Sequence, residues 1–188
     1  MRHMLLNANE AAEQLRLGKV IAYPTEAVFG LGCDPSNERA VRSILSLKQR
    51  PESAGLILIG ADFSQFEDWV AELPRDRLTP ALETWPGPVT WLFPPGPKTK
   101  SFITGDHDSV AIRVTAHEAS IELCKAFGGP VVSTSANPRS AEPARSSGEV
   151  EVYFGNYIGG ILEGALGGNR QPSEIRDLET GKVIRPSK

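Results

Sequence analysis

Helix-like and strand-like patterns alternate along this chain, and this alternation limits the folds that are open to it. Asn7 and Glu10 match a capping box ahead of an apolar stripe, Gly18 suits the end of that helix, and the apolar run 20–23 then indicates a strand. The same succession of helix and strand returns further along the chain. Alternation of this kind predicts an α/β fold, in which helices pack on an open sheet.

The remaining elements follow from periodicity and from helix-ending residues. Asn37 is expected to cap a helix that stops before Pro51, and an apolar stripe after Asp62 predicts a helix over 62–73 with a structural role only. A further helix is expected over about 117–127, and a polar stretch over 133–147. The predicted strands are 56–59, 89–93, 109–114 and 131–132, followed by a C-terminal hairpin of 174–178 and 182–185.

The composition is typical of one globular domain in a reducing compartment. With 188 residues, 40% of them hydrophobic, the chain has material for one core, so residues 1–188 are predicted to form a single domain. A net charge of −3 argues against non-specific coating of nucleic acid. Cys33 and Cys124 lack the spacing of a zinc site or a disulfide framework. Since no apolar run approaches the roughly 18 residues of a membrane span, we expect a cytoplasmic protein with no membrane segment.

Common catalytic signatures are absent from the sequence. It contains no P-loop, no dinucleotide-binding glycine pattern, no zinc-protease motif and no nucleophile elbow. Polar and basic groups gather instead where predicted strands and helices end. The stretch PTEAVFGLGCD, residues 24–34, follows the first strand. A strand end with a glycine-containing turn is where open α/β sheets bind ligands, and it is equally an ordinary way to turn the chain.

Three further polar features each allow a functional and a structural interpretation. Lys48 and Arg50, just before Pro51, could face one anion, or could simply complement the dipole at a helix C-terminus. Residues 133–137, with the sequence STSAN, could wrap a ligand or form a hydrogen-bonded turn. Arg113 alternates away from the apolar face of its strand, where an arginine is commonly a solvated edge residue.

Taken together and in order, six segments resemble the YrdC/TsaC family, the threonylcarbamoyl-AMP synthases of tRNA modification. The resemblance runs from about residue 11 to residue 185, and the chain is similar to the short single-domain bacterial form. The six segments are YPTEAVFGLG (23–32), KQRP (48–51), WPGPVT (85–90), VAIRV (110–114), STSAN (133–137) and PSEI (172–175).

This resemblance implies an enzyme that joins L-threonine, bicarbonate and ATP into threonylcarbamoyl-AMP and releases pyrophosphate. The product serves modification of the adenosine next to the anticodon in tRNAs that read codons starting with A. A separate tRNA threonylcarbamoyl transferase complex is the implied downstream partner, and the family also allows weak binding of tRNA. Mg²⁺ is expected with ATP, without a tightly bound cofactor. The implied fold is a twisted, open, mixed parallel/antiparallel sheet with flanking helices and a large concave pocket.

The resemblance also implies roles for individual residues. Thr25 and Arg113 are expected to hold threonine, the arginine by pairing with its carboxylate, and Ser173 is expected to contact the substrate. Lys48 and Arg50 are the expected catalytic pair, which neutralises charge at phosphorus. The positions that match nucleotide and phosphate contacts are Lys48, Arg50, Ser135, Asn137, Arg145 and Arg185.

Several neighbouring positions are unassigned or depart from the family pattern. Gly30 and Gly32 are expected to let the backbone pass close to the pocket, and Glu26 has no assigned role. Gly55 and Leu58 stand where many relatives carry other residues, and the strand around Leu58 lacks the histidine that longer relatives present to threonine. The threonine pocket is therefore expected to be built differently from theirs.

Two alternative functions remain open beside the synthase. A non-catalytic RNA-binding or ribosome-maturation factor could use the same concave surface, although the chain is acidic overall and does not interleave aromatic and basic residues. A carbamoyl-adenylate-forming module of the hydrogenase-maturation type is the second alternative. Dependence of turnover on threonine or on carbamoyl phosphate would distinguish the two enzymes.

Overall fold

A computed structural model of the chain describes residues 5–168 and 173–187. Within these residues the helices are α1 (Ala8–Arg16), α2 (Glu38–Lys48), α3 (Arg75–Leu82), α4 (Ser101–Thr104), α5 (Glu118–Phe127) and α6 (Ser147–Phe154), with the 3-10 helices η1 (Glu52–Ala54) and η2 (Phe63–Phe66). The strands are β1 (Leu5–Leu6), β2 (Ile21–Pro24), β3 (Phe29–Gly32), β4 (Ile57–Gly60), β5 (Val89–Phe93), β6 (Val110–Val114), β7 (Val131–Ser135), β8 (Ile161–Leu162), β9 (Glu174–Asp177) and β10 (Val183–Arg185). Met1 to Met4 and Pro172 of the PSEI segment lie outside the described residues.

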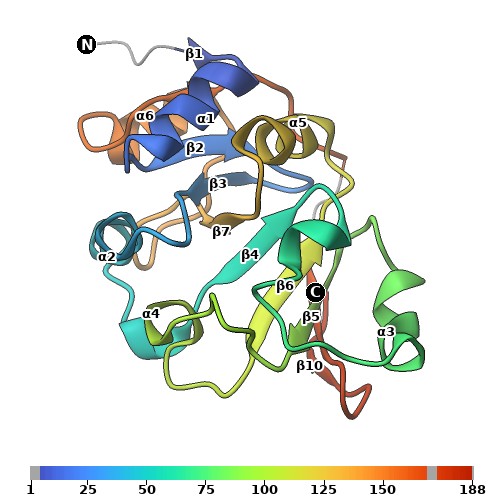
Figure 1. The fold of residues 1–188 in the computed structure, drawn as a ribbon. Coiled ribbons are helices and arrows are strands. Elements are labelled where there is room, and N and C mark those ends of the chain that lie inside the picture. Colours follow the sequence, from blue (N-terminus) through green and yellow to red (C-terminus); the bar gives the residue numbers. More distant parts are fainter. Residues whose placement is uncertain (1–4, 169–172, 188) are drawn as a thin grey trace.

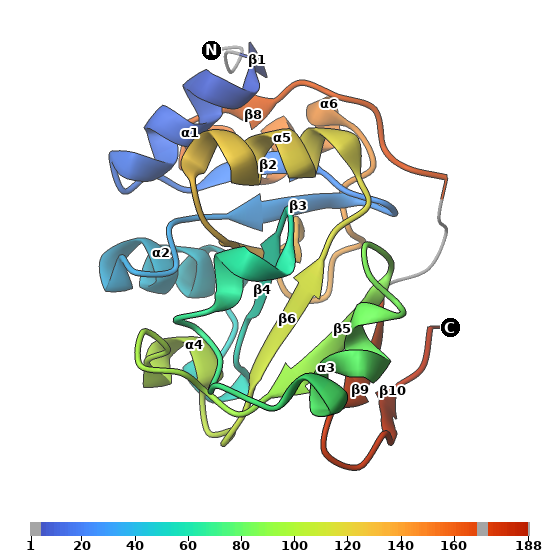
Figure 2. The ribbon, with the colours of Figure 1, turned by 45° about the vertical axis from the view of Figure 1, so that its right-hand side comes forward.

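The described strands form one mixed sheet with the order β1-β8-β2-β3-β7-β4-β6-β5-β9-β10. The pairs β1–β8, β2–β8, β4–β6 and β5–β9 are parallel, and the pairs β2–β3, β3–β7, β4–β7, β5–β6 and β9–β10 are antiparallel. The mixed α/β sheet is therefore confirmed. β7 pairs with β3 on one side and with β4 on the other, and so joins the two halves of the sheet (Figures 1 and 2).

Both faces of the sheet are buried where helices cover them. α1 and α5 lie side by side on one face, as Figure 2 shows, while α2 and α6 contribute to the core on the other. Consecutive strand residues point to opposite faces, so Ala22 packs into one apolar cluster and Tyr23 into the other, as do Leu58 and Ile59. No helix of the described residues is both long enough and apolar enough to cross a membrane.

Local signals placed several elements correctly. The Asn7 side chain accepts from the backbone N–H groups of Asn9 and Glu10, each at 3.0 Å, while the Glu10 carboxylate accepts from the Asn7 N–H at 2.8 Å, which completes the predicted capping box. The Asn37 side chain caps α2 by accepting from Ala40 N–H at 3.1 Å. The predicted C-terminal hairpin is also confirmed by the antiparallel pair β9 and β10.

The predicted helix over 62–73 is wrong. Only the 3-10 turn η2 forms there, and the next helix, α3, begins at Arg75. The backbone beyond η2 bonds instead to the loop after β5: Ala71 N–H donates to Pro94 O at 2.9 Å, and Gly96 N–H donates to Trp69 O at 2.9 Å. The apolar residues of this segment are buried by those tertiary contacts, so helical spacing was not needed to bury them.

Two predicted turns are strands. Phe29–Gly32, expected as a glycine-containing turn, forms β3 and pairs with β2, while the turn lies at residues 25–28. β7 continues beyond the predicted 131–132 to Ser135. Gly32 does not approach the cavity as expected, because a Cβ there would lie 2.7 Å from the Tyr23 ring and 2.8 Å from Val132 O. Gly32 is required by packing between neighbouring strands.

Candidate functional site

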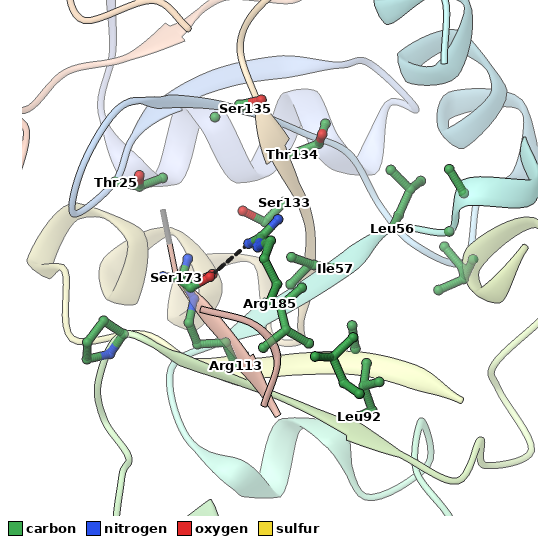
Figure 3. Close-up of a pocket in the computed structure, with 18 of the residues that line it drawn as sticks. Thr25, Leu56, Ile57, Leu92, Arg113, Ser133, Thr134, Ser135, Ser173 and Arg185 are labelled. Atoms are coloured by element: carbon green, nitrogen blue, oxygen red, sulfur yellow. Dashed lines mark hydrogen bonds between the residues drawn. The ribbon is translucent and has the colours of Figure 1, made fainter. Parts of the chain in front are cut away.

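A cavity of about 400 Å³ lies between the two halves of the sheet, a volume within the usual range for small-molecule sites. Its walls come from the turn after β2, the start of β4, the middle of β6, the end of β7 and the β9–β10 hairpin. Figure 3 shows side chains from these separate segments converging on the space. The lining includes the site candidates Thr25, Arg50, Arg113, Ser135, Ser173 and Arg185.

Three arginines of the described residues line the cavity: Arg50, Arg113 and Arg185. Burial, followed by the charges of Arg113 and Arg50, lowers the pKa of Arg185 below its ordinary value. The direction of this shift agrees with a position of Arg185 near the charges of Arg113 and Arg50 in the same cavity. Such a concentration of positive charge favours anions, and guanidinium groups suit carboxylates and phosphates.

Arg113 is buried at the base of the cavity, with 8% of its surface exposed. The predicted alternation in its strand is confirmed, since Val110, Ile112 and Val114 point into the core on the opposite face. Arg113 Nη1 donates to Glu26 Oε2 at 3.2 Å, and its Nε has no hydrogen-bond partner among the described residues. The interpretation as a solvated edge arginine is therefore wrong. A buried guanidinium with free donor capacity suits a ligand.

Glu26, which had no assigned role, is a second charge of this site and is partly buried. Its Oε1 accepts from Thr115 Oγ1 at 2.7 Å, and its Oε2 accepts from Arg113. Burial raises the pKa of Glu26, but the Arg113 charge and the Thr115 hydrogen bond outweigh it and bring the pKa below its usual value. Glu26 therefore stays ionised at neutral pH. The only local signal for it was an acidic residue directly after a buried strand.

Two hydroxyl residues, Thr25 and Ser173, line the cavity together with Arg113 (Figure 3). Thr25 is buried and donates through Oγ1 to Val28 O at 2.7 Å, which leaves the lone pairs of this oxygen as acceptors. Ser173 Oγ accepts from Thr90 Oγ1 at 3.1 Å, and Ser173 O accepts from Arg185 Nη2 at 2.8 Å. The structure thus brings Thr25, Arg113 and Ser173 together, although they are far apart in the sequence.

Lys48 and Arg50 lie in different surroundings. Arg50 lines the cavity and donates through Nη2 to Ala54 O and Gly55 O, each at 3.1 Å. Lys48 is buried outside the lining, and its Nζ donates to Ser135 O at 2.5 Å and to Asn137 O at 3.0 Å. Burial and the nearby Arg50 charge lower the pKa of Lys48 to about 8. In this structure Lys48 holds the 135–137 backbone in place, and its catalytic role stays a prediction.

The STSAN segment contributes its first three residues to the cavity wall: Ser133, Thr134 and Ser135. Ser135 Oγ donates to Asn137 Oδ1 at 2.6 Å, and Asn137 Nδ2 donates to Ala141 O at 2.8 Å, so the Asn137 side chain stabilises the turn outside the lining. Arg145 is exposed and also lies outside the lining. The nucleotide roles of Asn137 and Arg145 therefore stay predictions.

Thr104 and His107 are among the lining residues that sequence reasoning did not find. Both come from α4 and the loop after it, which carries no motif. No group of three or more His, Cys, Asp or Glu residues in the described part of the chain is arranged to hold a metal ion. Among the described residues that line the cavity, Glu26 is the only carboxylate and His107 the only histidine, which is too few protein ligands for a resident metal ion.

Comparison with known proteins gives consistent matches over nearly the whole chain. The family model Sua5_yciO_yrdC, described as telomere recombination, matches residues 13–187. A threonylcarbamoyl-AMP synthase of Cellvibrio japonicus is 53% identical over 182 residues, which is 95% of each chain. One of Stenotrophomonas maltophilia is 49% identical over 182 residues, covering 96% of this chain and 98% of the relative.

A solved structure extends the likeness to three dimensions. P. abyssi Sua5 complexed with L-threonine superimposes with a TM-score of 0.88 at 34% identity, over 96% of this chain. The chain spans 54% of the length of that protein.

Proposed function

The chain belongs to the Sua5/YciO/YrdC family, and on this basis we propose that it functions as a threonylcarbamoyl-AMP synthase. The reaction joins L-threonine, bicarbonate and ATP into threonylcarbamoyl-AMP, with release of pyrophosphate and water. The observation that carries the proposal is the cavity itself, in which the buried Arg113 lies near two hydroxyl residues while Arg50 and Arg185 supply further cations. Relatives that share about half of its residues bear the name of this enzyme.

In the proposed complex, the threonine carboxylate binds the free donors of Arg113. Thr25 and Ser173 line the same cavity and offer hydroxyl oxygens to the substrate. The triphosphate of ATP binds near Arg50 and Arg185, next to the 133–135 strand end. The wall formed by Ser135 is held in place from behind by Lys48.

The residues of this cavity act by positioning and by electrostatics. The neutral amine of threonine first condenses with bicarbonate to give a carbamate and water. A carbamate oxygen then attacks the α-phosphorus of ATP, and pyrophosphate leaves. Because a carbamate decomposes readily in water, the walled cavity protects it, and the arginines stabilise charge that develops on the phosphate. No covalent nucleophile is required, since holding the two reactants in line supplies much of the rate enhancement. Mg²⁺ would enter bound to the triphosphate and to water.

Beyond the cavity, the proposal includes the downstream partners. The adenylate passes to a separate tRNA threonylcarbamoyl transferase complex, and this chain itself binds tRNA weakly at most. A cytoplasmic location agrees with these substrates.

The test is direct synthesis by the purified protein. ATP, bicarbonate and isotope-labelled L-threonine are mixed with it, and threonylcarbamoyl-AMP and pyrophosphate are followed by liquid chromatography and mass spectrometry. We expect both products to form together and to vanish when threonine is omitted. Turnover that depends on carbamoyl phosphate would indicate the hydrogenase-maturation type of activity. Absence of turnover together with tight RNA binding would indicate a non-catalytic RNA factor.

A further inference from the structure

Glu26 is the single carboxylate among the described residues that line the cavity, where it faces three arginines. Its presence is a cost for a site that binds ATP and bicarbonate, because a partly buried negative charge repels both. The ion pair with Arg113 offsets part of this cost, since a neutral residue would leave that guanidinium without a counter-charge. A substrate group of positive charge would offset the remainder.

The contacts of Glu26 leave it free to bind such a group. Its side chain is 12% exposed, and Oε2 receives one hydrogen bond from Arg113, at 3.2 Å, in place of a two-point pair. Oε1 receives one hydrogen bond, from Thr115. A carboxylate offers about four acceptor sites, so both oxygens keep capacity for a further donor.

An α-amino acid carries its two charges on neighbouring atoms, since the ammonium and the carboxylate are both attached to Cα. A carboxylate bound to Arg113 therefore places the ammonium beside the partner of Arg113, which is Glu26. We propose that Glu26 binds the α-ammonium of threonine and makes the cavity selective for amino acids with a free amino group. The inference rests on the proposed function and adds a specificity-determining residue to it.

The selectivity can be measured with a ligand that lacks only the amino group. (R)-3-Hydroxybutanoate has the carboxylate, hydroxyl and methyl groups of L-threonine without its ammonium. In the unchanged protein, saturation-transfer NMR titrations are expected to show that threonine binds at least about tenfold more tightly, because the hydrogen bond to Glu26 is charge-assisted. Equal affinities for the two ligands would overturn the proposal without the need for any variant.

The Glu26→Gln variant tests whether Glu26 is the residue responsible for this preference. Glutamine keeps the shape of the side chain and an acceptor for Thr115 but removes the charge. We expect threonine affinity to fall by about tenfold, whereas the affinity for 3-hydroxybutanoate, an anion that the Glu26 charge repels, should stay the same or rise. A matched control is Glu163→Gln, because Glu163 lines the neighbouring hollow beside Glu26 but not the cavity, and it should leave both affinities unchanged. Thermal melts check that each variant is folded, and Glu26→Asp, which keeps the charge, should retain the preference for threonine.

Two results would contradict the role of Glu26. Equal weakening of both ligands would mean that Glu26 acts only by orienting Arg113, and unchanged threonine affinity would mean that the ammonium binds elsewhere. Failure of the proposed function gives a different pattern, in which the unchanged protein makes no threonylcarbamoyl-AMP.

Discussion

Arg113 shows how far the surroundings of one residue decide its role. Alternation along the strand predicted only that Arg113 points away from the apolar face. This orientation fits a solvated edge residue as well as a site residue. In the structure it is buried against Glu26, a residue 87 positions away in the sequence. Its guanidinium is thus desolvated and directed into a cavity, where a carboxylate can satisfy the donors that the protein leaves free.

For Arg113→Lys we expect the apparent affinity for threonine to weaken by roughly tenfold, about 1.4 kcal/mol, with ATP affinity much less affected. Lysine keeps the charge but loses the planar two-point fork. Calorimetric titrations of threonine and of ATP measure both effects. Arg176→Lys is the matched control, because Arg176 also lies on a strand and pairs with Glu174 but does not line the cavity. A loss confined to ATP would show that Arg113 does not bind the carboxylate.

For Lys48→Ala we expect turnover to fall by about 10²-fold, since removing one positioning or charge-stabilising group at such a site costs roughly that much. The loss arises because Ser135 and Asn137 lose the ammonium that holds their carbonyl groups. The rate of pyrophosphate release measures it, with a thermal melt to confirm folding. Wild-type rates of pyrophosphate release from the folded variant would show that Lys48 does not contribute to catalysis.

The lowered pKa of Lys48 predicts a pH dependence of stability. The pKa of Lys48 is about 8 in the folded protein, whereas the pKa of a lysine in an unfolded chain is about 10.4. Between these values the unfolded chain holds more protons, so the Lys48 contribution to the free energy of unfolding rises with pH. Below pH 8 the folded protein bears the full cost of the buried charge.

Urea denaturation of wild type and of Lys48→Met at pH 7 to 10 isolates this contribution. We expect the free energy of unfolding of the wild type, minus that of the variant, to increase as the pH rises above 8. Tyr23, Cys33 and Cys124 have the opposite effect on stability, because burial raises their pKa values. Both proteins contain these three residues, so their effect cancels in the difference between the two free energies of unfolding. A difference that does not change with pH would contradict the assignment.

The β2–β3 hairpin shows how an element positions the site. Thr25 N–H donates to Val28 O at 3.2 Å, which closes the turn and places Thr25 and Glu26 at the cavity. β3 can pack closely against Tyr23 and β7 because Gly32 has no side chain where it meets the Tyr23 ring and the Val132 carbonyl. The position of two site residues therefore depends on close packing of the strand that follows them.

For Gly32→Ala we expect a loss of about 1–3 kcal/mol in the free energy of unfolding, because the new methyl group meets the Tyr23 ring and the Val132 carbonyl in a packed core. Gly129→Ala is the matched control, since a Cβ there meets nothing within 4 Å, and we expect a change within about 0.5 kcal/mol. Urea denaturation compares the two. Equal stability of the two variants would show that β3 can shift to accommodate the methyl group.

The molecule as a whole is two parts of one sheet joined by β7, with the cavity between them. The turn after β2 comes from one part, β6 and the β9–β10 hairpin come from the other, and β7 itself supplies the 133–135 wall. A ligand in this cavity contacts both parts at once. Binding should therefore stabilise regions that are distant in sequence and belong to different halves of the sheet.

Hydrogen exchange tests this expectation. With ATP and threonine at saturating concentration, we expect slower amide exchange in residues 25–30, 54–57 and 174–185 together. Mass action also predicts a gain of about 2.7 kcal/mol in stability at a hundredfold excess over Kd. The outer helix α3, which does not line the cavity, serves as an internal control and should exchange at an unchanged rate apart from this global effect. Protection confined to one half would contradict a shared site.

Local sequence patterns alone predicted many of the secondary-structure elements of this protein. Caps at Asn7 and Asn37, the alternation around Arg113 and the C-terminal hairpin depend on neighbours within a few residues, and spacing reports such contacts directly. Six ordered segments predicted the family, which the comparisons confirm. The helix predicted over 62–73 failed because that segment is buried by the loop after β5, a contact that periodicity does not encode.

Only the tertiary structure decided which of the polar groups meet. The pairing of Glu26 with Arg113 and the bonds from Lys48 to the 135–137 turn join residues 87 to 89 positions apart. Such contacts follow from the order of strands in the sheet, which places β3, β7, β4 and β6 side by side out of their sequence order. Short-range spacing carries no information about that order. The sequence by itself therefore predicted six of the polar residues that line the cavity, and the arrangement of the sheet determined that Glu26 lies beside them.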